Sequence, residues 1–154
     1  MLRHQLATQR GVVLIEALLG ILIFSIGILA LIGMQSVAVK NTIDARYRTE
    51  AAYLANSVMS QMRLDMANIT LYPDSNTANY VPRTTWRNQV EATLPGIKVA
   101  SAQRVPAIST APGPTYGGDT DPPTRVTVII LWLQPGETQE RRFEIVSFLS
   151  RDVL

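Results

Sequence analysis

The distribution of apolar residues predicts one long helix at the start of the chain. Glu16 is the only charged residue between Arg10 and Lys40, and almost every other position in that stretch is apolar. Such a run is long enough to cross a bilayer, which takes about 20 apolar residues. A carboxylate inside a membrane costs free energy and is a functional hypothesis by default, so Glu16 is a candidate site residue.

The same helix is predicted to continue beyond the apolar run as an amphipathic helix. After Lys40, apolar and aromatic residues recur at steps of three and four, which places them on one helix face. These residues are Ile43, Tyr47, Ala51, Leu54, Val58, Met62, Met66 and Ile69. No proline occurs before Pro73, so we predict one helix from about Val12 to about Asn68. Three methionines along this face (Met59, Met62 and Met66) are interpreted as core packing residues.

The remaining pattern predicts a small antiparallel sheet, and therefore an α+β fold with a long N-terminal helix packed on that sheet. Strong strand signals form a hairpin, with a Pro-Gly turn between them. The predicted elements are a loop at 70–85, a short helix at Thr85–Leu94, a strand at Ile97–Val105, a surface loop at 106–124, a strand at Arg125–Leu133, a turn at 134–137 and a strand at Gln139–Ser150. The apolarity of Arg125–Leu133 predicts burial on both faces.

Composition excludes several kinds of chemistry. The chain has no cysteine, and its single histidine, His4, precedes the apolar run. Disulfides, Cys/His zinc sites and histidine catalysis are therefore not expected beyond that point, and we expect no enzyme activity and no cofactor. Removing Arg3 and Arg10 from the total leaves 12 basic residues against 12 acidic residues. This balance argues against nucleic-acid binding, which needs a basic surface.

The residues before the run predict its orientation. Residues 1–11 are short, polar and basic, so the positive-inside rule keeps them in the cytoplasm and sends the C-terminal part across the membrane. A secretory signal would place its cleavage site after the apolar core, and no clean site of that kind follows. Two alternatives remain: an uncleaved signal anchor, or a chain that is cut before the apolar run.

The motif at the start of the run favours the second alternative. Gly11, Val12 and Glu16, behind a basic leader and at the head of a long apolar helix, resemble the type IV prepilin signal. The segments 17–35 and 48–56 are similar to minor pilins of the PilV kind, the type IV pilus modification proteins. Val12 stands where that family most often has phenylalanine, and the absence of cysteine and of a mid-helix proline favours a minor over a major subunit.

The resemblance implies a processing pathway and a set of partners. A prepilin peptidase would cut after Gly11 and methylate the new terminus at Val12, and Glu16 would pair with a neighbouring subunit's terminal amine. The implied segments are a leader at 1–11, a membrane and filament-core half at 12–39, an amphipathic half at 40–68 and a periplasmic, later extracellular, pilin domain at 69–154. The implied partners are other pilins through their N-terminal helices, the inner membrane and the pilus assembly machinery.

The function implied is that of a minor pilin that is incorporated into a type IV pilus or primes its assembly, in support of adhesion or twitching motility. Two other readings remain open. A minor pseudopilin of a type II secretion system would share the signal, helix and sheet. A single-pass anchored sensor or enzyme domain would keep residues 1–11 and need convergent polar groups.

Other candidate sites have weaker patterns. Asp119 and Asp121 offer oxygen ligands for calcium, but their spacing lacks a full loop signature, so we interpret them as turn residues and expect no metal site. Arg141 and Arg142 form a basic pair suited to an acidic partner or to a solvated strand end. Tyr116 is a candidate contact residue beside two glycines.

Overall fold

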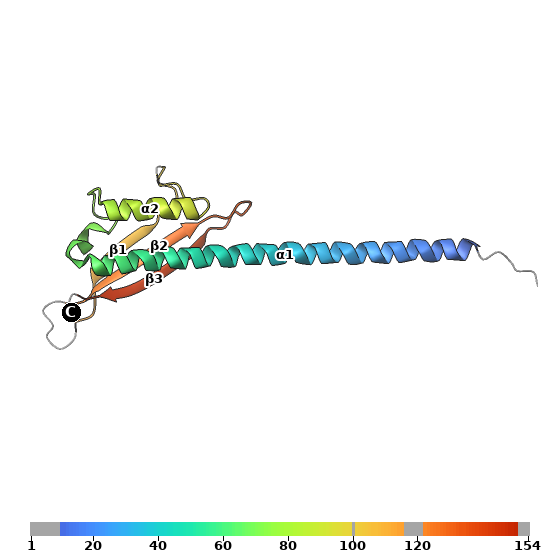
Figure 1. The fold of residues 1–154 in the computed structure, drawn as a ribbon, viewed down its shortest axis with the longest axis horizontal. Helices are drawn as coiled ribbons and strands as arrows, with labels where there is room; N and C mark the ends of the chain where they lie inside the picture. Colours follow the sequence, from blue (N-terminus) through green and yellow to red (C-terminus); the bar gives the residue numbers. More distant parts are fainter. Residues whose placement is uncertain (1–9, 100, 116–121, 151–154) are drawn as a thin grey trace, which may run out of the picture. The chain divides into compact units, whose positions relative to one another are not determined.

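The computed structural model describes residues 10–99, 101–115 and 122–150, and it confirms the predicted α+β layout. A long helix precedes a three-stranded antiparallel sheet whose strand order is β1-β2-β3 (Figure 1). The elements are α1 (Arg10–Leu64), the 3₁₀ helix η1 (Met66–Leu71), α2 (Val81–Thr93), β1 (Ala107–Pro112), β2 (Thr124–Trp132) and β3 (Arg141–Leu149).

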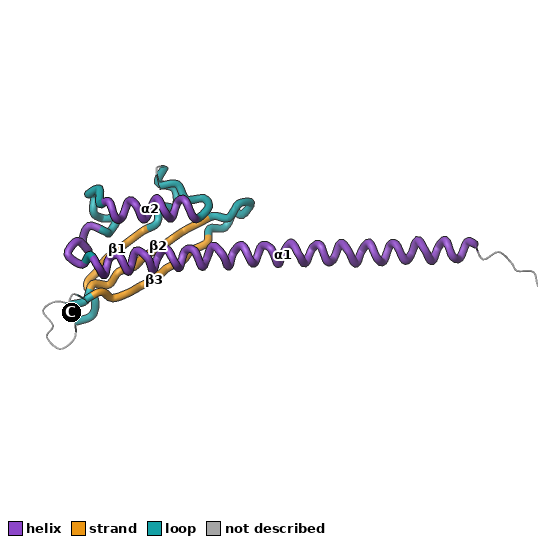
Figure 2. The backbone as a smooth tube through the Cα atoms, in the orientation of Figure 1, coloured by secondary structure: helices purple, strands orange, loops and turns teal. Residues whose placement is uncertain are grey.

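The chain divides into two compact units, Met1–Asp44 and Ala45–Leu154. The described part of the first unit is helix alone, and every residue from Gly11 to Ile43 in it is exposed. The second unit contains the rest of α1 together with α2 and the sheet, and Figure 2 shows the three strands side by side. Near this boundary α1 changes from a helix that is exposed on all sides to one that is buried on one face. The change in the sequence from an unbroken apolar run to a one-sided apolar stripe predicts this.

All buried apolar residues of the described chain belong to the second unit. Most come from one face of α1, one face of α2 and the inner face of the sheet, and the others come from η1 and the segments that flank α2. Together they form a single core. Its members are Ala51, Leu54, Ala55, Val58, Met59, Met62, Ile69, Tyr72, Trp86, Val90, Leu94, Ile97, Ile108, Val126, Val128, Ile130, Trp132 and Leu149. The interpretation of Met59 and Met62 as core residues is confirmed, and Met66 is partly buried against this core.

Helix α1 ends at Leu64, four residues before the predicted end at Asn68. Asp65 leaves helical geometry with φ −121° and ψ 42°, and the chain continues as η1. Its carboxylate accepts a hydrogen bond of 2.7 Å from the Asn68 amide. Short polar side chains compete with the helix for hydrogen bonds in this way, so the helix ends here without a proline.

Helix α2 begins at Val81, four residues earlier than the predicted start at Thr85. The prediction treated Pro82 as part of a loop. Proline is tolerated in the first turn of a helix, because the N–H that it lacks would have no intrahelical partner there. The predicted end of this helix, at Leu94, is correct to within one residue.

The predicted strand at Ile97–Val105 is wrong. Lys98 and Gln103 form an isolated bridge around a tight turn. Ala102 within this turn and Arg104 directly after it have φ of 53° and 51°, a left-handed conformation that no regular strand accommodates.

The first strand of the sheet instead lies inside the predicted surface loop. Strand β1 covers Ala107–Pro112 and pairs with β2 from Ala107↔Ile129 to Pro112↔Thr124. It is an edge strand, and proline is tolerated at a sheet edge because its missing N–H can face away from the ladder. The proline content of this region therefore misled the prediction.

The predicted hairpin of β2 and β3 is confirmed. Its register runs from Thr124↔Leu149 to Trp132↔Arg141, and Gly136, with φ 80°, lies in the turn between the strands. The prediction that β2 is buried on both faces is wrong. Only alternate residues from Val126 to Trp132 are fully buried, while the residues between them are partly buried.

Candidate functional site

The predicted processing site lies at the start of α1. The helix begins at Arg10, so Gly11 and Val12 lie in its first turn, and the side chain of Val12 is 65% exposed. A Cβ added at Gly11 would meet nothing within 4 Å. The rest of the predicted leader, residues 1–9, lies outside the described residues.

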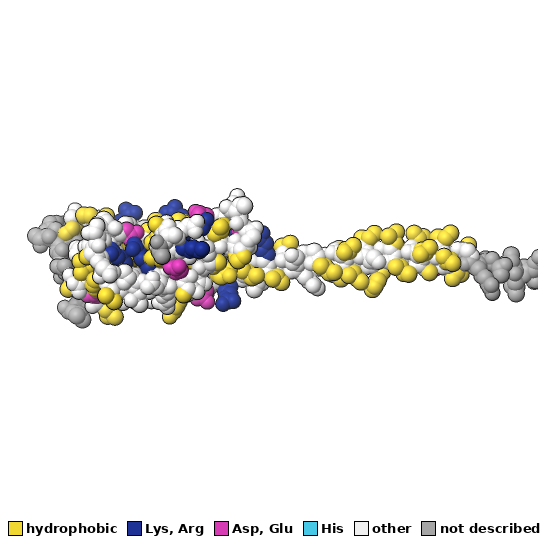
Figure 3. All heavy atoms as spheres, turned by 90° about the horizontal axis from the view of Figure 1, so that it is seen from above, with side chains coloured by type: hydrophobic (Ala, Val, Ile, Leu, Met, Phe, Trp, Pro, Cys, Tyr) yellow, Lys and Arg dark blue, Asp and Glu magenta, His cyan; other side chains and the backbone are white. Residues whose placement is uncertain are grey.

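The side chains that follow are apolar on all sides of the helix and exposed. Figure 3 shows apolar side chains along α1, whereas basic and acidic side chains gather on the second unit. Fifteen large apolar side chains between Val12 and Ile32 are at least 41% exposed. Full burial of each would be worth about 1.5–3 kcal/mol, so leaving them in water would cost a few tens of kcal/mol in total. An apolar environment around this half of α1, such as a membrane, would recover that free energy.

Length and composition agree with such an environment. The helix contains an 18-residue window with a mean hydropathy of 2.7, of which 0% is buried inside the protein. The chain therefore has an N-terminal helix that is long and apolar enough to cross a membrane.

Glu16 differs from Ser25, a second polar residue of the apolar run, in how its polar group is hydrogen-bonded. The hydroxyl of Ser25 donates a hydrogen bond of 2.7 Å to the carbonyl oxygen of Ile21, so it is satisfied within the helix. The carboxylate of Glu16 takes part in none of the ion pairs or hydrogen bonds of residues 10–99, 101–115 and 122–150. In an apolar environment an unpaired carboxylate is penalised, and no described residue of the chain supplies a partner for Glu16.

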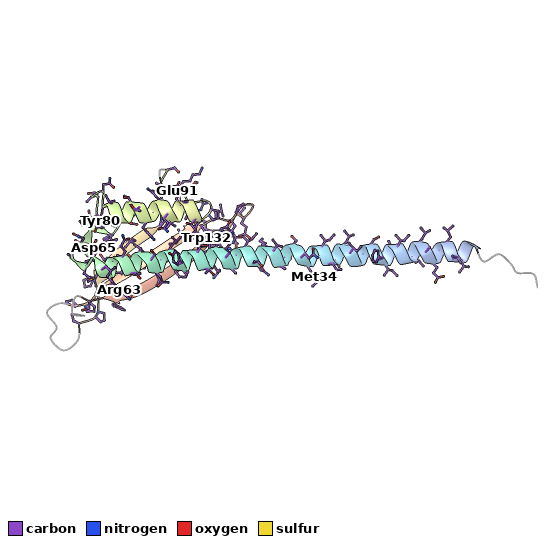
Figure 4. All side chains as sticks on the ribbon, viewed as in Figure 1. Met34, Arg63, Asp65, Tyr80, Glu91 and Trp132 are labelled. Carbon is purple, nitrogen blue, oxygen red and sulfur yellow. The ribbon has the colours of Figure 1, made fainter. Side chains whose placement is uncertain are left out.

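A second polar cluster ties the end of α1 to the start of α2. The carboxylate of Asp65 accepts hydrogen bonds from the hydroxyls of Tyr80 and Tyr72, the latter at 3.3 Å, as well as from Asn68 (Figure 4). The two tyrosine rings meet edge to face with their centroids 5.0 Å apart.

These contacts shift the ionisation of all three groups. The Tyr80 and Asn68 hydrogen bonds lower the pKa of Asp65 below its ordinary value of 3.8. Burial, reinforced by the neighbouring Tyr80 and Asp65, raises the pKa of Tyr72, and the hydrogen bond to Asp65 raises the pKa of Tyr80. The tyrosines therefore remain neutral donors to an ionised carboxylate, which favours a structural rather than an acid–base role.

Arg83 organises the loop that joins η1 to α2. Its side chain is 5% exposed and donates to the carbonyl oxygens of Pro73 at 2.7 Å, Asn76 at 2.8 Å and Ala78. One helical turn later, Arg87 forms an ion pair with Asp74 from the same loop. The roles of Arg83 and Asp65 could not be predicted from the sequence, because their partners are main-chain carbonyls and distant tyrosines that no local spacing indicates.

The remaining candidate residues divide into three that the structure does not describe and the basic pair Arg141 and Arg142. Asp119, Asp121 and Tyr116 lie outside the described residues. Within the described ranges, no group of three or more His, Cys, Asp or Glu side chains is placed to hold a metal ion. Arg141 and Arg142 form ion pairs of 3.2 Å and 2.6 Å with Glu137 and Glu144 of the same chain, so the charge of this basic pair is balanced internally.

A shallow depression beside β1, about 270 Å³ in volume, offers no acid, base or activated nucleophile. Its lining consists of Thr110, Ala111, Pro112, Pro122 and Thr124. Among the described residues, Glu16 is thus the best candidate site residue, because its carboxylate has no partner and lies in the exposed apolar half of α1.

Comparison with known proteins adds no further assignment, because no family model, no curated protein and no solved structure matches this chain with significant similarity.

Proposed function

We propose that this chain is a prepilin-type subunit, a minor pilin that is inserted in the inner membrane, cut after Gly11 and incorporated into a type IV pilus. The observation that carries the proposal is an all-round exposed apolar helix with one unpartnered acid, Glu16, which is the fifth residue after the cleavage position. The α+β domain that follows this helix is the layout that the resemblance to prepilins implies.

The proposal gives the carboxylate of Glu16 a partner of suitable charge. Cleavage after Gly11 releases an α-amino group at Val12, at the head of the apolar helix. In a bundle of such helices, the amine of one subunit neutralises the carboxylate of its neighbour. Because either charge alone is costly in an apolar surrounding, the pair selects one register of packing. The favourable helix dipole at the first turns contributes only about 0.3–1 kcal/mol and does not replace this partner.

Mass spectrometry of the protein from the membrane fraction tests the processing step. Loss of residues 1–11 together with one added methyl group is expected. Gly11→Val serves as the control, since the added side chain meets open space and should block cleavage without disturbing the helix. Recovery of the wild-type chain with Met1 still in place would reject the proposal.

Substitution of the acid tests the assembly step. Glu16→Ala should be inserted and processed normally, but its recovery in sheared pili should fall strongly. Ser25→Ala is the matched control in the same helix, because that hydroxyl is already satisfied by the Ile21 carbonyl. Wild-type recovery of Glu16→Ala in pili would contradict the pairing of Glu16 with an amine.

A minor pseudopilin of a type II secretion system is the alternative that these two experiments leave open, since it would be processed and assembled in the same way. A deletion strain separates the two functions: loss of adhesion or twitching supports the pilus, and loss of secretion alone supports the pseudopilus.

A further inference from the structure

No further inference is drawn: the strongest candidate, a groove along α1 lined by Ala30, Gly33, Met34, Val37, Ala38 and Asn41, carries none because it is an unpartnered apolar helix face and nothing in the described structure shows what covers it.

Discussion

Replacement of Arg83 by methionine is expected to destabilise the second unit far more than the same replacement of Arg87, although the two lie one turn apart on α2. The guanidinium of Arg83 is 5% exposed and donates to three carbonyl oxygens of the loop before α2. Arg87 instead pairs with Asp74, and their side chains are 16% and 38% exposed. The two variants therefore compare a buried cation that orders a loop with an ion pair near the surface.

The magnitude follows from the number and kind of hydrogen bonds. A hydrogen bond to a charged group contributes about 1.5–3 kcal/mol, and Arg83 makes three of them. Burial of the guanidinium offsets part of this gain by several kcal/mol, and the freed carbonyls regain some water as the loop loosens. We therefore expect Arg83→Met to cost about 2–4 kcal/mol. Arg87→Met should cost about 0–1 kcal/mol, as a surface ion pair does.

Tryptophan fluorescence of the full chain in detergent micelles measures this difference. Both tryptophans, Trp86 and Trp132, are at most 3% exposed and lie in the core of the second unit, so their emission reports its unfolding. For a domain of about 100 residues, each kcal/mol shifts Tm by roughly 4–8 °C, so Arg83→Met should lower Tm by about 10 °C or more. Equal and small shifts for both variants would refute the assignment of Arg83 as the residue that orders the loop.

Three further substitutions test the polar cluster, a turn and the contact between the helices. The pKa of Asp65 is lower in the folded than in the unfolded state, so ionisation of this carboxylate stabilises the fold above pH 3.8. This contribution is lost on acidification. The difference in the free energy of unfolding between wild type and Asp65→Asn should therefore shrink between pH 6 and pH 2. Gly96→Ala should cost about 1–3 kcal/mol, because φ is 76° and the new Cβ would lie 2.9 Å from Leu133. Gly136→Ala, which has φ of 80° but open space around the new Cβ, should cost about 1 kcal/mol. Equal losses of stability in thermal unfolding would contradict the steric argument. Trp86→Phe should lower the free energy of unfolding by about 1–3 kcal/mol, because it removes a 2.9 Å hydrogen bond to the main chain of α1 and part of a buried ring. Denaturant titrations measure this loss. A loss below about 0.5 kcal/mol would contradict the stabilising role of this hydrogen bond.

The parts of the fold that depend on periodicity could be predicted from the sequence. From Tyr47 to Met62 the apolar stripe of α1 faces the core as predicted, whereas Ile43, the first residue of the predicted stripe, is 41% exposed. The β2–β3 hairpin has the predicted position. In both cases the signal is local and repeated, so one unusual residue does not change the outcome.

The errors concern residues whose effect depends on tertiary position. Proline was read as loop at Pro82 and Pro112, yet the first turn of a helix and the edge of a sheet both accept it. Nothing in the sequence indicated that β1 would be an edge strand. The left-handed conformation of Ala102 and Arg104 was equally hidden, because neither residue type favours it.

The position of Glu16 has an energetic consequence that separates membrane insertion from assembly. Fifteen large apolar side chains lie between Val12 and Ile32. At about 0.3–0.6 kcal/mol each on an insertion scale, they favour the membrane by roughly 5–9 kcal/mol. A carboxylate costs about 2.5–3.5 kcal/mol at the helix centre and less near its end, where Glu16 lies, so insertion is favourable with the acid present and unpaired. The proposed amine partner is therefore not needed for entry into the bilayer, and it would stabilise the chain only where helices pack together and exclude lipid headgroups and water. A defect of Glu16→Ala that is confined to assembly, with insertion intact, is the outcome that this balance of free energies requires.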